Sequence, residues 1–196
     1  MGKSVVVTGA NSGIGLVTCL ELAGAGWDVI GTARSAVKID RLHEVAQTKG
    51  VTVRSVICDV DDASSCEQAF GEIAAMTGGG PWAVVNNAGF AQSGAVEDVS
   101  DALVRAQLET NVVAPIRIAR LVLPGMRERG EGRMLFPPRT STACRPPLVV
   151  GRLQFIAPAP QQQRRMMLTA LDVVGGDLDQ ATDRGRIARR RVVWPR

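Results

Sequence analysis

TGANSGIG, the stretch from Thr8 to Gly15, decides the fold. It follows an apolar run, Val5-Val6-Val7, that is typical of a buried strand, and it precedes apolar residues at helical spacing. Three of its eight residues are glycines, which let a backbone turn sharply and pass close to a ligand. A helix that begins there directs unpaired N–H groups and a partial positive charge outward. The stretch therefore predicts a turn that binds the pyrophosphate of a dinucleotide.

Outward from this turn, strand-like and helix-like segments alternate along the chain, with short connections, up to about residue 130. The predicted strands cover residues 4–8, 27–33, 51–58 and 82–85, with a fifth that begins at 134. Such alternation is typical of a parallel sheet that is covered by helices on both faces. We therefore predict an α/β fold, with a Rossmann-type doubly wound parallel sheet in residues 1–133.

The helices between these strands carry recognisable end signals. Gly50 is suited to a left-handed cap after the second helix, and Asp61 or Asp62 is expected to cap the third. In the last helical region Pro115 interrupts the pattern, because proline lacks the N–H of a helical hydrogen bond. The apolar stripe predicted to be buried there consists of Leu108, Val112, Ile116, Ala119, Leu123 and Met126.

Composition and charge divide the chain into two parts. The 196 residues are 45% hydrophobic and 21% charged, which is typical of a soluble globular protein. Residues 1–130 hold 11 Lys and Arg against 14 Asp and Glu, whereas residues 131–196 hold 12 arginines against 5 acids. We interpret residues 134–196 as an atypical Arg/Pro-rich tail, in which the C-terminal part of the sheet is incomplete or irregular.

Several classes of site and location are not expected. The four cysteines form no CxxC pair, and His43 is the only histidine, so a metal site is not predicted. The sequence shows no signal peptide and no segment long enough to span a membrane. We therefore expect a cytoplasmic protein with reduced thiols that does not bind a membrane.

Three further features fall at the edge of the predicted sheet where ligands bind in open α/β folds. Asp59 and Val60 follow the third strand, and the run from Asn86 to Gly89 follows the fourth. Asn111 lies in the helical region that comes next. Together with the glycine turn, these features resemble the short-chain dehydrogenase/reductase family over roughly residues 3–133.

The resemblance implies a role for each matched residue. Thr8, Gly9, Gly13 and Gly15 match the family's T-G-x-x-x-G-x-G cofactor loop, and Asn11, Ser12 and Ile14 are expected to contact the cofactor with them. Asp59 and Val60 match the pair that contacts the adenine ring. Asn86, Ala88 and Gly89 match the motif that supports the sheet near the cofactor ribose, and Asn111 matches the asparagine that holds a water in a proton relay.

The end of the second strand indicates which cofactor is preferred. A carboxylate about 20 residues beyond the glycines bonds the 2′-hydroxyl of NAD, whereas an arginine accommodates the 2′-phosphate of NADP. This chain has Arg34 there and no acid, and the planar guanidinium can pair with a phosphate. We therefore predict NADP rather than NAD.

The catalytic half of the family pattern is missing. The family uses a tyrosine in a Tyr-x-x-x-Lys motif, with a lysine that lowers the tyrosine's pKa and a serine that orients the substrate. This chain contains no tyrosine, and the expected region has Phe155 and Arg152 instead. Ser141 is a candidate for the serine, so Asn111 and Ser141 are the only predicted catalytic residues.

Several interpretations of the function stay open. The first is an NADP-dependent oxidoreductase that transfers hydride between the cofactor and a small carbonyl or alcohol compound. The second is a catalytically inactive dinucleotide-binding protein, or a truncated or frameshifted family product. A third treats the arginines from 184 to 191 as a nucleic-acid contact, but no aromatic platform accompanies them, so nucleic acid is not a predicted partner. A homo-oligomer is left open, because the helix that holds Asn111 resembles the family's dimerisation helix.

Overall fold

A computed structural model describes residues 3–92 and 94–137 of the chain. Five parallel strands form one sheet in the order β3-β2-β1-β4-β5. The strands are β1 (Ser4–Thr8), β2 (Asp28–Ala33), β3 (Arg54–Ile57), β4 (Ala83–Val85) and β5 (Arg133–Leu135). The α-helices are α1 (Gly13–Gly24), α2 (Ala36–Thr48), α3 (Ala63–Thr77), α4 (Asp101–Leu108) and α5 (Ala114–Glu128). This confirms the predicted α/β fold class.

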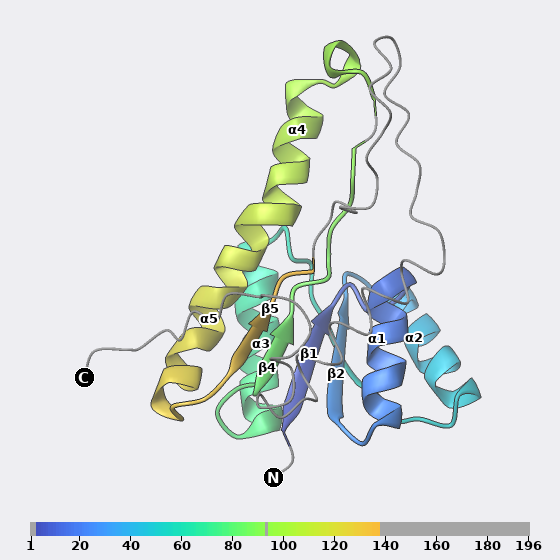
Figure 1. The fold of residues 1–196 in the computed structure, drawn as a ribbon, viewed down its shortest axis with the longest axis vertical. Coiled ribbons are helices and arrows are strands. Elements are labelled where there is room, and N and C mark those ends of the chain that lie inside the picture. The colour runs from blue at the N-terminus through green and yellow to red at the C-terminus, as the bar shows by residue number, and fades with distance from the viewer. Residues whose placement is uncertain (1–2, 93, 138–196) are drawn as a thin grey trace, which may run out of the picture.

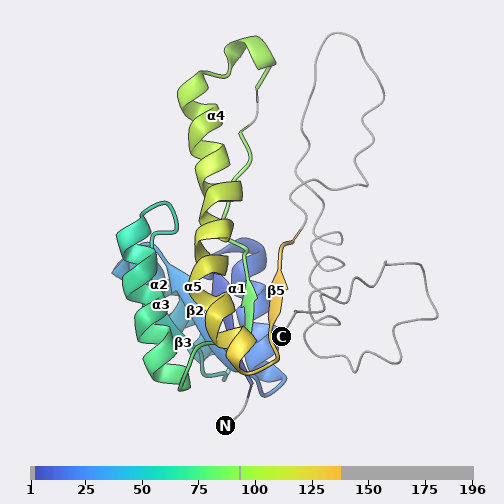
Figure 2. The same ribbon diagram turned by 90° about the vertical axis from the view of Figure 1, so that its left-hand side faces the viewer.

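Helices cover both faces of the sheet, because each strand directs alternate side chains to opposite sides (Figures 1 and 2). Val5 and Val7 of β1 pack with residues of α1 and α2, whereas Val6 packs with residues of α3 and α5. All three valines are fully buried. In the strand order, β2 and β3 lie on one side of β1, and β4 and β5 lie on the other. Ligands of such sheets bind in the crevice outside the carboxyl ends of the two strands where the order reverses, here β1 and β4.

Two of the predicted helix ends are confirmed. Gly50 follows α2 with a φ of +67°, and Asp62 is the N-cap of α3. The Asp62 carboxylate accepts hydrogen bonds from the amides of Ser64 (2.8 Å) and Ser65 (3.4 Å). Hydrogen bonds from the hydroxyl and the amide of Ser64 lower the pKa of Asp62.

The helical region around Asn111 differs from the prediction. Residues Glu109–Val113 form a π-helical turn, η2, in which the amide of Ala114 donates to the carbonyl of Glu109, five residues earlier. Pro115 has no N–H and its ring crowds the carbonyl four residues before it, so a wider turn relieves the conflict. As Figures 1 and 2 show, α4, η2 and α5 form one rod whose α4 end projects beyond the carboxyl edge of the sheet.

The predicted buried stripe is wrong in its first half, because α4 projects beyond the sheet and buries none of its residues, and because the π turn interrupts the helical period. Leu108, Val112 and Ile116 are about half exposed, whereas Ala114, Pro115, Ile118, Val122 and Met126 are buried. The stripe assumed an uninterrupted α-helical period, and the wider turn shifts which residues face the sheet.

The different burial of Ile116 and Ile118, two positions apart on α5, predicts that their substitution affects stability unequally. Ile118→Ala should lower the free energy of unfolding by about 2–5 kcal/mol, because it leaves a cavity beneath the sheet. Ile116→Ala, at a side chain 47% exposed, should change it by less than about 1 kcal/mol. Urea unfolding monitored by circular dichroism measures both values. A larger loss for Ile116→Ala would restore the stripe expected from the sequence.

Candidate functional site

The glycine turn after β1 is joined directly to the segment after β4. The Asn87 side-chain amide donates to the carbonyls of Thr8 (2.9 Å) and Gly9 (3.3 Å). In return, the Thr8 hydroxyl accepts the amide of Ala88 at 2.9 Å. These contacts bring together two of the predicted cofactor segments, although they lie about 80 residues apart in the sequence.

Two glycines are needed for this junction. Gly9 has a φ of +66°, and a Cβ there would lie 3.0 Å from the Cα of Ala88. At Gly15 a Cβ would overlap both the Asn87 amide nitrogen and the Gly9 carbonyl oxygen. A Cβ at Gly15 would therefore force the junction apart, and one at Gly9 would be strained by the left-handed backbone and by the close approach of Ala88.

The helix that follows the turn, α1, begins without a side-chain cap. Ser12 is the N-cap of α1 in extended conformation, and its side chain makes no capping hydrogen bond. The first turn of α1 contains no acidic residue, and both Ser12 and Gly13 are exposed. The N–H groups of Gly13, Ile14 and Gly15 are thus oriented as in helix N-termini that bind anions.

The end of β2 lies beside the same turn. The amide of Ala10 donates to the carbonyl of Thr32 at 2.8 Å, which ties the turn to β2. Arg34 follows two residues later with an exposed side chain, and it forms none of the ion pairs found in residues 3–92 and 94–137. A cation at this place is positioned for an anionic group of a ligand in the turn.

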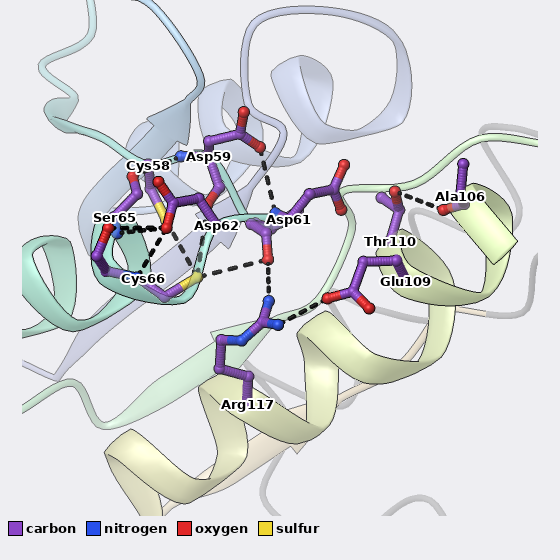
Figure 3. Close-up of polar contacts among 12 residues, drawn as sticks. Cys58, Asp59, Asp61, Asp62, Ser65, Cys66, Ala106, Glu109, Thr110 and Arg117 are labelled. Atoms are coloured by element: carbon purple, nitrogen blue, oxygen red, sulfur yellow. Dashed lines mark hydrogen bonds and ion pairs between the residues drawn. The ribbon is translucent and has the colours of Figure 1, made fainter. Parts of the chain in front are cut away.

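Asp59 and Val60 form a tightly held segment between β3 and α3 (Figure 3). The Asp59 amide donates to the Ser65 hydroxyl at 3.0 Å, and the Asp59 carboxylate accepts the Asp61 amide at 3.2 Å. From α5, Arg117 donates to the carbonyl of Val60 at 2.7 Å.

Arg117 also pairs with Glu109 of the π turn at 2.6 Å, and this ion pair raises the pKa of Arg117. The guanidinium therefore connects the Asp59–Val60 segment to the turn that holds Asn111 (Figure 3).

Asn86 and Asn111 hold backbone segments in place. Asn86 is buried, and both its backbone amide (2.9 Å) and its side-chain nitrogen (3.5 Å) lie within reach of the Leu135 carbonyl on β5. Asn111 exchanges two hydrogen bonds with the backbone of Phe90, at 2.7 and 3.2 Å. Asn111 therefore fixes the chain just beyond Gly89, at the same edge of the sheet.

Sequence reasoning missed three contributors to this site: Asn87, Arg117 and Cys66. Asn87 belongs to the quoted run from Asn86 to Gly89, so that motif was the available signal, but the hydrogen bonds to the glycine turn follow only from the fold. Arg117 and Cys66 carry no motif and meet the Asp59–Val60 segment through tertiary contacts. Ser141, Arg152, Phe155 and the tail arginines lie outside the described residues.

The arrangement fits a dinucleotide. The uncapped start of α1 suits a pyrophosphate, and the junction with Asn87 and Ala88 holds the turn that precedes it. Within residues 3–92 and 94–137, no three His, Cys, Asp or Glu side chains are grouped so that they could hold a metal ion. None of the described helices is both long and apolar enough to cross a membrane.

Comparisons with known proteins give one consistent family. The sequence model described as "short chain dehydrogenase" matches residues 3–148. The uncharacterized oxidoreductase YbbO of Escherichia coli is 33% identical over 135 residues, which cover 69% of this chain and 48% of that protein.

Solved structures agree with this match. A crystal structure of an actinorhodin polyketide ketoreductase with NADPH has a TM-score of 0.64 at 31% identity, covering 68% of this chain and 51% of that one. A metagenomic short-chain oxidoreductase in complex with NADP has a TM-score of 0.62 at 28% identity, covering 68% and 60% of the two chains. The chain thus spans about half the length of the curated relatives it matches.

The packing at Gly15 predicts an effect that a second glycine of the same helix should not share. Gly15→Ala should lower the free energy of unfolding by about 1–3 kcal/mol, because the new methyl group displaces Asn87 or Gly9. Gly24→Ala, whose Cβ would meet only Val51 at 3.9 Å, should leave stability unchanged or raise it by up to about 1 kcal/mol. Thermal unfolding of both variants measures the difference, and equal stabilities would contradict the junction.

Proposed function

Since this chain belongs to the short-chain dehydrogenase/reductase family, a family of NAD(P)-dependent oxidoreductases, we propose that it binds NADP(H) at the carboxyl edge of its sheet. The observation that carries the proposal is the junction of Thr8, Gly9 and Gly15 with Asn87 and Ala88. It fixes the glycine turn at the start of α1, where a pyrophosphate would accept hydrogen bonds from the N–H groups of Gly13, Ile14 and Gly15. Asn11 and Ser12 lie in the same turn.

The rest of the cofactor is assigned to the other segments at this edge of the sheet. The adenine ring would lie against Asp59 and Val60, and the ribose near Asn86, Ala88 and Gly89. Bound NADP(H) supplies or accepts a hydride. The chain's own residues bind and orient the cofactor, and Asn111 fixes the backbone of Phe90 beside the ribose segment.

Arg34 supports a preference for NADP(H) over NAD(H). Its exposed guanidinium stands two residues beyond Thr32, whose carbonyl is bonded to the glycine turn. A phosphate on the adenosine ribose would form charge-assisted hydrogen bonds with this group, and a hydroxyl would gain less.

A matched pair of arginine variants tests this preference. Arg34→Ala should raise the Kd for NADPH by about 10- to 100-fold, the effect of losing charge-assisted hydrogen bonds, and should leave the Kd for NADH nearly unchanged. Arg41→Ala removes an equally exposed charge on α2 and should alter neither value. Titrations monitored by protein fluorescence measure all four constants. No binding of either cofactor by the unaltered chain would refute the proposal.

We further propose that this 196-residue chain binds the cofactor but reduces or oxidises substrates only slowly. Reduction of a carbonyl needs a proton at the oxygen, and the family supplies it from a tyrosine, which this chain lacks. Arginine cannot take that role because it stays protonated in proteins. The substrates in question are small carbonyl or alcohol compounds.

A turnover assay tests this second proposal. With NADPH and a panel of small ketones and aldehydes, the chain should react about 10²- to 10⁴-fold more slowly than a ketoreductase that has the tyrosine, which is the usual contribution of a positioned general acid. Oxidation of NADPH followed by absorbance measures the rate. Rates equal to those of the ketoreductase would contradict the proposal.

A further inference from the structure

Two cysteines flank the segment that is proposed to hold the adenine ring. Cys58 follows β3 and Cys66 lies in α3, and their sulfur atoms are 4.0 Å apart (Figure 3). Both side chains are buried, at 3% and 0% exposure. Asp59 and Val60 follow Cys58 directly, so the two thiols lie next to the start of this segment.

The two thiols are chemically unequal. The thiol of Cys58 donates to the sulfur of Cys66, and this raises the pKa of Cys58 and lowers that of Cys66. The charge of Arg117 also lowers the pKa of Cys66, against the effect of burial. A thiolate is the reactive form of cysteine, and Arg117, which binds the same Val60 carbonyl as Cys66, places a positive charge on the Cys66 side of the pair. Cys66 is therefore assigned as the nucleophile and Cys58 as its neighbouring thiol.

Cys66 also holds the backbone of the segment. Its sulfur lies 3.6 Å from the carbonyl oxygens of Asp59 and Val60, within reach of its S–H group. Arg117 binds the same Val60 carbonyl from α5. Any change in the Cys66 sulfur therefore alters the support of the residues assigned to the adenine ring.

We propose that Cys58 and Cys66 form an oxidation site for small hydroperoxides, which reach the buried pair when the start of α3 opens locally, and that the resulting disulfide weakens cofactor binding. The Cys66 thiolate attacks the O–O bond, and with one proton this gives a sulfenic acid and releases water or an alcohol. The Cys58 sulfur then attacks the sulfenic sulfur, the S–S bond forms, and the sulfenic OH leaves as water with the proton of the Cys58 thiol. The two thiols lose two electrons in total, which reduce the hydroperoxide.

The disulfide would act on the segment in two ways. The sulfur atoms must approach from 4.0 Å to about 2.0 Å, which changes the side-chain conformations at the end of β3 and the start of α3. Cys66 also loses the S–H group that faces the carbonyls of Asp59 and Val60. The effect on cofactor binding rests on the proposed function of this segment. Formation of the disulfide and affinity for the cofactor are therefore tested separately.

Cys19 provides a matched control. It is as buried as Cys66, and burial raises its pKa to about 12, so it stays protonated at neutral pH. No described cysteine sulfur is bonded to it. Cys19→Ala should therefore leave the oxidation site intact.

The site itself is tested by peptide mapping of the full chain. Trypsin leaves both thiols in one peptide, because residues 55–104 contain no Lys or Arg. Cleavage before aspartates separates them, into residues 40–58 and 62–97, and places Cys19 and Cys144 in two other peptides. After treatment with hydrogen peroxide and alkylation of free thiols, we expect the 40–58 and 62–97 peptides to be linked. Absence of this link, or a link to another cysteine, overturns the proposal.

The effect on binding is tested on the same samples. Oxidation should raise the Kd for NADPH by about tenfold, as expected for the loss of one or two hydrogen bonds in the site, and dithiothreitol should restore it. Cys19→Ala should respond in the same way, whereas Cys66→Ser, compared with its own untreated form, should not respond. A linked pair without a change in Kd overturns the regulatory role. If the reduced chain binds no cofactor, the proposed function and this role fail together, and the mapping alone decides whether the oxidation site exists.

Discussion

The Asn87 side chain joins the two halves of the site, because its amide donates at once to the carbonyls of Thr8 and Gly9. These carbonyls belong to a turn in which Gly9 adopts a left-handed conformation, and the amide holds that turn against the continuation of β4. The absence of a Cβ at Gly15 makes room for the contact. The junction thereby fixes the turn from which α1 and the N–H groups of its first turn begin.

Other contacts extend the junction along the edge of the sheet. Ala10 bonds to Thr32 and so brings the end of β2 and Arg34 into line with the turn. On the opposite side, Arg117 bonds both Val60 and Glu109, so it connects the segment after β3 to the π turn. A dinucleotide that lies along this edge would contact loops that are already connected to one another, which lowers the entropy lost on binding.

The sequence predicted the regular parts of the fold well, because they depend on local patterns. The residues of β1 were predicted without error, and Asp62 and Gly50 were recognised from end signals that act within a few residues. The buried stripe around Ile116 failed because a single proline changes the helical period, and periodicity alone cannot register a π turn. Arg117 and Cys66 were missed for another reason. Both contact Val60, which lies 57 residues before Arg117 and 6 residues before Cys66. No pattern along the chain marks these contacts.

The assignment of the cofactor segments by family resemblance remains a prediction. Asn86, which the resemblance places near the ribose, uses its side chain here to reach β5, so its part in binding would be indirect. Arg34 and the uncapped start of α1 have few partners in the described part of the chain, so both are accessible to an anionic ligand.

A dinucleotide bound at the glycine turn should perturb the backbone amides that surround it. This is tested by following the backbone amide resonances of the isotopically labelled chain while NADPH is added. We expect the amides of Gly13, Ile14 and Gly15 to shift most, together with those of Asp59, Val60 and Ala88. Shifts confined to the arginines from 184 to 191, or no shifts at the glycine turn, would contradict it.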